Sequence, residues 1–253
     1  MAKKKNPNKI NIFCSTSQAR LSEVNNLLIP SLEKQSYKGD IHLFLLDYEA
    51  NNKIKREDLT EKTKIDILIV NPNKPVGFGE AHSYSFNLIK PENYFLIINS
   101  DISLERNCIE EMISTFDENI GLIEARQLPF QHPKDKPQKE TFSTNWASGC
   151  CLLINSKFFK KVNGFDSNYW MYLEDVDLSW KAWINGYKVV QNPKAVAYHY
   201  TGAYFKYQGN SYELEHFWSI RNFLYISYVF WGELGLNKAK TLIDKLSISE
   251  NIK

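Results

Sequence analysis

Stretches of strand-like and helix-like patterning alternate along most of the chain. Four continuous apolar runs have strand length and lack polar alternation, as expected of strands covered on both faces: 10–15, 41–47, 65–70 and 94–101. Apolar residues recur at helical spacing in three further segments: 21–32, 81–88 and 105–118. Pro30 must bend or break the first of these helices. The alternation predicts an α/β fold with a mostly parallel central sheet flanked by helices.

The second half of the chain is less regular. A polar segment with three prolines, residues 126–145, predicts a loop or lid, and residues 147–154 resume the core as a strand. Residues 187–200 predict two short strands on either side of Pro193. The last part is rich in aromatic residues with helical spacing. We therefore expect one domain over residues 1–210 and a helical extension, residues 211–253, packed on it.

Composition narrows the function classes. The 253 residues carry a formal net charge of +2, and apart from Lys3–Lys5 the basic residues are scattered, which disfavours nucleic-acid binding. The four cysteines form no C-x-x-C pair and are expected to be buried free thiols in a reducing cytoplasm. We find no signal-peptide pattern, and the longest apolar run, 223–231, falls short of the roughly 20 residues of a membrane span. A cytoplasmic location is the prediction.

Two predicted strands end in an aspartate, Asp47 and Asp101. Ligands of open parallel sheets collect at the carboxyl ends of the strands, so a nucleotide-sized ligand is expected there. Asp47 has a second interpretation, as a cap of the following turn. A carboxylate such as Asp101 can also hold Mg²⁺ while substrate phosphates and water complete its coordination.

An acidic cluster occupies the predicted first turn of a helix that Gly186 ends. Glu174, Asp175 and Asp177 would complement the helix dipole there, but that role does not account for the aromatic run before them. Aromatic faces stack on sugar rings, and a neighbouring carboxylate can take a proton from a hydroxyl group. The segment Gly77–Gly79 lacks the third glycine of a dinucleotide fingerprint, which disfavours a dehydrogenase.

Taken together, the segments resemble family-2 glycosyltransferases of the GT-A fold, in particular the rhamnosyltransferase-like enzymes that build bacterial surface polysaccharides. The likeness covers about residues 9–202. Four stretches carry it: "SQARLSEVNNLLIPSLEKQ", "NKPVGFGEAHSYSFN", "YFLIINSD", and the segment from "WASGCC" to "AYHYTG". The last stretch is the most specific, because a sugar-site strand, a "GFD" turn, an "ED" helix and a terminal histidine follow in order.

The resemblance implies roles for individual residues. Asp175 would be the general base, Glu174 would bind or orient the acceptor, and Asp101 with His199 would hold Mg²⁺ or Mn²⁺. Nucleotide contacts would come from the strand ends and glycine loop: Ser15, Thr16, Ser17, Asp47, Gly77, Gly79, Asn99 and Ser100. The donor sugar and the acceptor would contact a second set of residues: Trp146, Ser148, Gly149, Trp170 and Tyr172. A lone histidine such as His199 is, by itself, more often structural.

The implied reaction is a single displacement with inversion, from a UDP- or dTDP-sugar to a hydroxyl of a glycan or lipid-linked acceptor. Asn99 departs from the pattern, since many relatives have an aspartate there, and Cys14 replaces the usual tyrosine or asparagine. Fewer negative ligands weaken metal binding, so metal dependence stays open. Asn99 also favours the main alternative, a non-catalytic nucleotide-sugar-binding module that serves as scaffold for a partner transferase.

Two further alternatives concern the class of enzyme and the C-terminal segment. A sugar-phosphate nucleotidyltransferase would require a glycine-rich, basic loop after the first strand, and "CSTSQAR" is neither. For residues 211–253 we favour packing or homo-oligomerisation. The alternative is peripheral contact with the inner face of a membrane through aromatic side chains, with Arg221 and Lys238 toward the headgroups.

Overall fold

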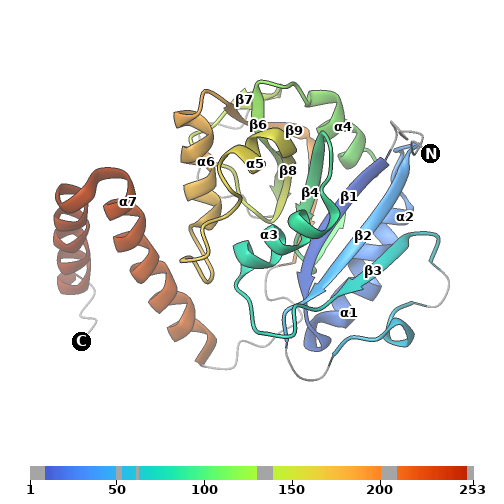
Figure 1. The fold of residues 1–253 in the computed structure, drawn as a ribbon, viewed down its shortest axis with the longest axis horizontal. Coiled ribbons are helices and arrows are strands. Elements are labelled where there is room, and N and C mark those ends of the chain that lie inside the picture. The colour runs from blue at the N-terminus through green and yellow to red at the C-terminus, as the bar shows by residue number, and fades with distance from the viewer. Residues whose placement is uncertain (1–8, 50–52, 61–62, 130–138, 201–209, 250–253) are drawn as a thin grey trace.

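The computed structural model describes residues 9–49, 53–60, 63–129, 139–200 and 210–249 (Figure 1). Within these residues, nine strands form one sheet in the order β3-β2-β1-β4-β8-β6-β9-β5, and β7 pairs with β9. The strands have these bounds: β1 Lys9–Thr16, β2 Asp40–Asp47, β3 Asp66–Val70, β4 Tyr94–Ile98, β5 Ile102–Leu104, β6 Ile120–Leu128, β7 Phe142–Ser143, β8 Cys151–Asn155 and β9 Lys188–His199.

The sheet has a parallel half and a mixed half. β1 pairs in parallel with β2 and β4, and β2 does so with β3, so these four carboxyl ends share one edge. From β4 onward, β8 runs antiparallel to both β4 and β6, while β6 and β9 are parallel. The predicted α/β fold is confirmed, and its parallel arrangement holds around β1.

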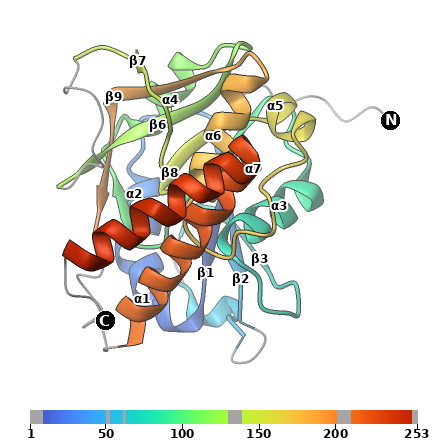
Figure 2. The same ribbon diagram turned by 90° about the vertical axis from the view of Figure 1, so that its left-hand side faces the viewer.

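Helices cover both faces of the sheet (Figures 1 and 2). Their bounds are α1 Leu21–Glu23, α2 Ile29–Glu33, α3 Phe78–Ile89, α4 Cys108–Thr115, α5 Ser156–Lys161, α6 Glu174–Ile184 and α7 Asn210–Ser249. One buried cluster joins the sheet to α1, α2 and α4, and a second, rich in phenylalanine, joins it to α3, α5 and α6. All four cysteines are free and buried, as predicted.

Three predicted elements differ in detail. The helix expected over 21–32 is broken by a π-helical turn, Val24–Leu28, after which Pro30 lies in the first turn of α2, where its missing N–H costs nothing. Of the four residues expected to form the buried face of α3, Ala81 and Ser85 are buried as predicted. Tyr84 and Leu88 are exposed, and Phe86 faces the core instead.

The two strands expected on either side of Pro193 are one continuous strand, β9. Its register against β6 shifts between the pairs Ala125–Asn192 and Arg126–Val196, which leaves residues 193–195 as a bulge. A bulge needs no ladder hydrogen bond from its residues, so proline fits it without ending the strand. The predicted loop 126–145 is partly outside the described residues, but its ends belong to β6 and β7.

The C-terminal residues form α7, which bends at Gly232, where φ is +59° (Figure 1). The two arms pack closely, since a Cβ on Gly235 would lie 2.3 Å from the carbonyl oxygen of Ser227. In Figure 2 the helix crosses in front of the body of the protein. Within the described part of the chain, no helix combines the length and apolar character that crossing a membrane requires.

Candidate active site

The turn after β4 carries Asn99, Ser100 and Asp101. Asp101 is 6% exposed, and its Oδ1 lies 3.3 Å from Nε2 of His199, the last residue of β9. Strand β5 begins directly after Asp101 and pairs with the end of β9, which keeps the two side chains together. Burial raises the pKa of Asp101, but hydrogen bonding to His199 and the positive charges of His199 and Arg20 outweigh burial and lower this pKa below its usual value.

Two buried residues of β6 orient the His199 ring. Gln127 Nε2 donates to Glu124 at 3.3 Å, so Gln127 Oε1 faces Nδ1 of His199, also at 3.3 Å. Nδ1 therefore donates to Gln127, which directs Nε2 at a carboxylate oxygen of Asp101. In the charged ring Nε2 donates to Asp101, and without that proton both atoms are acceptors. Two facing acceptors suit a shared cation, and metal-binding histidines usually donate their other N–H in this way.

The residues thus fit a divalent metal. Asp101 supplies an oxygen and His199 a nitrogen, and Mg²⁺ characteristically takes its remaining ligands from substrate phosphates and water. Among the residues that the structure describes, no group of three or more His, Cys, Asp or Glu side chains could hold a metal ion. Asn99 Nδ2 lies 3.4 Å from His199 Nε2, so this residue borders the same position as a neutral group.

Charged residues that the sequence analysis missed lie next to Asp101. Arg20 Nη1 is 3.3 Å from Glu23 Oε2 and 3.9 Å from Asp101 Oδ2, and Ser100 Oγ donates to Glu23 at 3.2 Å. Glu23 is 2% exposed, and its burial, helped by the charge of Asp101, raises its pKa in spite of Arg20. The stretch "SQARLSE" could have predicted this ion pair, because its arginine and glutamate lie three residues apart directly after the first strand.

The carboxyl ends of β1 and β2 are less accessible to a ligand than the sequence predicts. Asp47 is fully buried, and its carboxylate accepts hydrogen bonds from the backbone N–H groups of Glu49 and Ile54 and from Asn71 Nδ2. These contacts correspond to the capping interpretation of Asp47. Of the three contacts predicted at the carboxyl end of β1, Thr16 and Ser17 are also buried, which leaves Ser15. This edge is organised by hydrogen bonds within the protein.

The second group of candidate residues lies at the start of α6. Asp175 is half-buried, and its Oδ2 accepts a hydrogen bond from the Gly149 N–H at 2.9 Å. Its Oδ1 accepts one from the N–H of Val176 at 2.8 Å. Asp177, in contrast, is buried in an ion pair with Lys181 at 2.6 Å. The acidic cluster therefore contains one residue, Asp175, that faces Gly149 and another, Asp177, whose charge is paired within α6.

Glu174 is the most perturbed of these acids. It is 5% exposed, and its Oε2 has no hydrogen-bond partner among the residues that the structure describes. Burial, followed by the charges of Asp175 and Asp177, raises the pKa of Glu174 to about 8. A carboxyl whose pKa is raised by burial and by a neighbouring carboxylate is typical of acid–base sites.

A short chain of hydrogen bonds joins the two groups. The N–H of Asn99, in the Asp101 turn, donates to the carbonyl of Cys150 at 2.9 Å. The preceding residue, Gly149, donates to Asp175. Ser148 is buried beside them, and its Oγ lies 3.4 Å from the N–H of Cys150. The Asp101 turn and Asp175 thus lie on either side of the segment predicted to line the donor sugar.

The glycines predicted to lie near the nucleotide contact another part of the molecule. A Cβ on Gly77 would lie 2.3 Å from the carbonyl oxygen of Trp170, and one on Gly79 would lie 2.8 Å from Cβ of Phe165. The N–H of Phe78 donates to the same Trp170 carbonyl at 2.9 Å. The structure therefore places this loop against the aromatic segment before α6.

That aromatic segment, residues 166–173, is here called the acceptor-side loop. Trp170 is 38% exposed and stacks on Trp218 of α7, with ring centroids 6.4 Å apart. Tyr172 is partly exposed, with a left-handed backbone. Trp146, also half-buried, precedes Ser148 on the neighbouring segment, and Ser179 Oγ of α6 accepts from the N–H of Ala147. Sequence reasoning did not predict the contact with α7.

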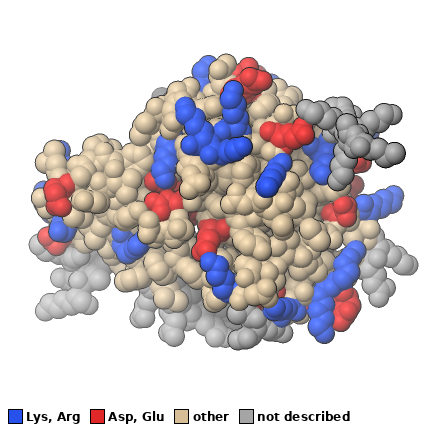
Figure 3. All heavy atoms as spheres, viewed as in Figure 1, with Lys and Arg blue, Asp and Glu red and all other residues tan. Residues whose placement is uncertain are grey.

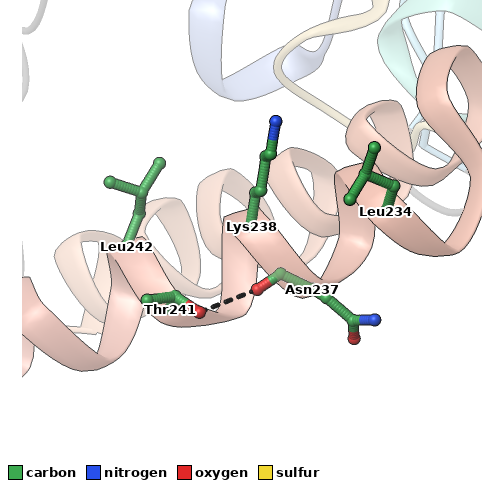
Figure 4. Close-up of a pocket in the computed structure, with 5 residues that line it drawn as sticks. All are labelled: Leu234, Asn237, Lys238, Thr241 and Leu242. Atoms are coloured by element: carbon green, nitrogen blue, oxygen red, sulfur yellow. Dashed lines mark hydrogen bonds between the residues drawn. The ribbon is translucent and has the colours of Figure 1, made fainter.

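A shallow groove on the surface lies elsewhere (Figure 4). All of its lining residues belong to the second arm of α7: Leu234, Asn237, Lys238, Thr241 and Leu242. Because one exposed helix supplies the whole lining, this groove has no polar groups converging from different elements, as a catalytic pocket would. It does not belong to the candidate active site.

Sequence comparisons match part of the chain. A family model described as the N-terminal domain of galactosyltransferase matches residues 134–206. The N-acetylglucosaminyl-diphospho-decaprenol L-rhamnosyltransferase of Mycobacterium tuberculosis (strain H37Rv) is 38% identical over 68 residues, which is 27% of this chain and 20% of that protein. Rhamnosyltransferase WbbL of Escherichia coli K12 is 35% identical over 68 residues, 27% of this chain and 25% of that protein. The matches thus span a quarter or less of these relatives.

Structural comparisons cover more of the chain. Residues 1–349 of S. aureus TarS give a TM-score of 0.60 at 16% identity, over 76% of this chain and 60% of that one. The mannosyltransferase PcManGT of Pyrobaculum calidifontis, solved with GDP-Man and Mn²⁺, gives 0.61 at 13% identity, over 88% and 63%. The chain has the GT-A fold, and the comparisons confirm its resemblance to rhamnosyltransferase-like glycosyltransferases.

Proposed function

We propose that this chain, with its GT-A fold, is an inverting glycosyltransferase that moves a sugar from a UDP- or dTDP-sugar to a hydroxyl group of a glycan or lipid-linked acceptor in bacterial surface polysaccharide synthesis. The observation that carries the proposal is the chain of hydrogen bonds from Asn99 through Cys150 and Gly149 to Asp175. It connects a diphosphate-binding turn to a candidate base through the segment expected to hold the donor sugar.

Asp175 is the proposed general base. Each of its oxygens accepts one backbone N–H, which fixes the orientation of the carboxylate that would take the proton of an acceptor hydroxyl. Glu174, whose pKa is about 8, carries a proton at neutral pH and can donate a hydrogen bond to the acceptor. One carboxyl thus takes the proton while its neighbour orients the attacking oxygen.

Asp101 and His199 are the proposed holders of Mg²⁺ or Mn²⁺, with Gln127 fixing the histidine ring. Bound there, the ion supplies positive charge that stabilises the leaving diphosphate. Arg20 lies 3.9 Å from Asp101 and 38% of its side chain is exposed, so its guanidinium is within reach of the same phosphates. Its charge offsets the missing acid at Asn99 by binding the diphosphate directly.

The acceptor is proposed by analogy with the mycobacterial relative, whose name gives a lipid-linked diphosphate sugar as the group it glycosylates. Several exposed apolar side chains of α7 suit contact with a membrane that holds such a lipid: Leu214, Phe217, Tyr228, Val229, Trp231, Leu234, Leu242 and Leu246. On the face in Figure 3, α7 is mostly uncharged, with acidic and basic side chains side by side.

Release of nucleoside diphosphate tests the function. The purified chain is offered UDP- and dTDP-sugars with Mn²⁺ and lipid-linked or glycan acceptors, and product stereochemistry is read by NMR. Acceptor-dependent release with inverted configuration is expected. Donor binding, seen as a raised melting temperature without turnover with any acceptor, would favour the non-catalytic binding module instead.

Membrane contact has its own test. Liposomes of anionic lipid are sedimented with the full chain and with the double variant Leu234→Ser/Leu242→Ser, whose sites are 66% and 51% exposed. Reduced co-sedimentation of the variant at unchanged melting temperature is expected. Equal sedimentation of both proteins would remove these residues from the interface, and a change in elution volume on gel filtration would assign them to self-association.

A further inference from the structure

We propose that Asn222 of α7 is a positioning residue for transfer, because it holds the acceptor-side loop in the conformation that aims Glu174 and Asp175. The inference deepens the proposed function and rests on it for the catalytic consequence. It concerns a residue in the helical extension, outside the stretches in which the resemblance to glycosyltransferases lies.

The loop has an unfavourable backbone just before the catalytic pair. Tyr172 and Leu173 both have left-handed conformations, with φ of +71° and +67°. The left-handed region costs a residue with a side chain roughly 1–2 kcal/mol, and two such residues in succession need compensation from their surroundings. Leu173 also accepts the first helical hydrogen bond of α6, from the Asp177 N–H at 2.9 Å. The geometry of this turn therefore sets the direction in which α6 begins.

Asn222 supplies that compensation. It is fully buried, and both hydrogens of its side-chain amide are used: Nδ2 donates to the carbonyls of Met171 and Tyr172, each at 2.7 Å. These bonds fix the two peptide planes that lead into the left-handed turn. Its Oδ1 in turn accepts from Arg221 Nη1 at 2.7 Å, which orients the amide.

Neighbouring residues of α7 hold the other end of the same loop. Arg221 donates to the carbonyl of Asn168, and Tyr225 donates to Asp166 at 3.0 Å. Trp218 stacks on Trp170. One face of α7 thus binds the acceptor-side loop along its length, and Asn222 is the member nearest to Glu174.

The consequence is catalytic because Asp175 is attached to this turn. If the two carbonyls lose their donors, the turn can relax toward right-handed φ values, and the carboxylate moves away from the Gly149 N–H that now orients it. A displacement of about 1 Å in a reacting group can cost on the order of 10²-fold in rate. Donor binding at Asp101 and His199 is on another turn and should not change.

The test compares Asn222→Leu, which has similar size and no donors, with Ile226→Ala, a buried apolar residue one helical turn away. Hydrogen exchange over peptides spanning 166–177 and steady-state kinetics are measured well below the melting temperature. For Asn222→Leu we expect at least about tenfold faster exchange in those peptides, and a kcat lower by about 10- to 100-fold at an unchanged donor KM. Ile226→Ala should lower the melting temperature and leave both readouts unchanged.

A rescue separates positioning from stability. Leu173→Gly, added to Asn222→Leu, removes the left-handed strain at one of the two residues of the turn and should restore part of kcat and of the protection. If Asn222→Leu does not fold, Asn222→Ser, which keeps one donor, replaces it. Wild-type exchange and kcat in the Asn222 variants, or equal losses in Ile226→Ala, would overturn the proposal. Faster exchange in the Asn222 variants of a protein that transfers no sugar would contradict the proposed function, but it would still support the role of Asn222 in holding the loop.

Discussion

The two sides of the candidate site are built in different ways. Asp101 and His199 lie at the ends of paired strands, and a buried glutamine orients the histidine ring. Asp175 follows a loop with two left-handed residues, which a distant helix holds in place. The proposed metal and diphosphate side is therefore part of the sheet, whereas the proposed acceptor side depends on contacts with α7. A transferase that binds one nucleotide and must admit a larger acceptor can use this difference, since loops move at less cost than paired strands.

The largest effect should come from the acceptor side. Asp175→Asn removes the proposed base and keeps its shape, so turnover should fall about 10²- to 10⁴-fold while nucleotide affinity is retained. Transfer kinetics and isothermal titration with the nucleoside diphosphate measure the two quantities. Asp40→Asn, an exposed acid at the start of β2, is the control. Near-normal turnover of Asp175→Asn would show that the proton goes elsewhere.

The metal side should respond to a residue that never touches the ion. Gln127→Leu leaves Nδ1 of His199 without its acceptor, and losses of this kind typically weaken metal affinity by 10- to 100-fold. Manganese titration followed by electron paramagnetic resonance measures this in the presence of nucleoside diphosphate. If the manganese affinity of this variant is unchanged and the wild-type enzyme is fully active in the presence of a chelator, the charge of the diphosphate is neutralised by Arg20 rather than by a metal.

A smaller effect should follow pH on the acceptor side. Because folding raises the pKa of Glu174 to about 8, the folded state holds this proton where the unfolded state has lost it. Its contribution to stability is complete below the unfolded pKa of about 4.3 and is lost as the pH rises through about 8. Glu174→Gln, which mimics the protonated acid, should lessen this decline by on the order of 1 kcal/mol per pH unit. Urea midpoints from pH 5 to 9 measure it, and parallel curves for both proteins would contradict the assignment.

The smallest effect concerns the stacked pair between the loop and α7. Trp218→Leu keeps an apolar side chain but loses the ring that stacks on Trp170, which should cost about 0.5–1.5 kcal/mol of stability. A shift in tryptophan emission should accompany the lower melting temperature. Tyr228, on the same helix and 49% exposed, provides the matched control as Tyr228→Leu. Equal losses in both variants would mean that the stack adds nothing specific.

Much of the fold could be predicted because its signals are local. Continuous apolar runs marked β1, β2 and β3 within one residue at each end, and β4 from its first residue, since strands buried on both faces must be apolar throughout. Pro193 misled the prediction of β9, because proline is compatible with a strand once a bulge removes the need for its N–H, and the bulge depends on the register with β6. Tyr84 and Leu88 are exposed although their spacing fits a buried helix face. Periodicity shows which apolar side chains share a face of a helix, but it does not show which of them pack against another element.

For the candidate site, short stretches of sequence are enough to identify the available residues: an acid after β4, an acid pair opening α6, and a histidine ending β9. The surroundings of these residues depend on the tertiary structure. In the folded chain the carboxylate of Asp47 accepts hydrogen bonds from the turn after β2. Gln127 lies against the ring of His199, 72 residues further along the chain, and Asn222 lies against the loop before Glu174. The reason is physical: side-chain pattern records burial and local backbone preference, whereas a hydrogen bond between distant segments depends on strand register and helix packing, which no short stretch of sequence contains.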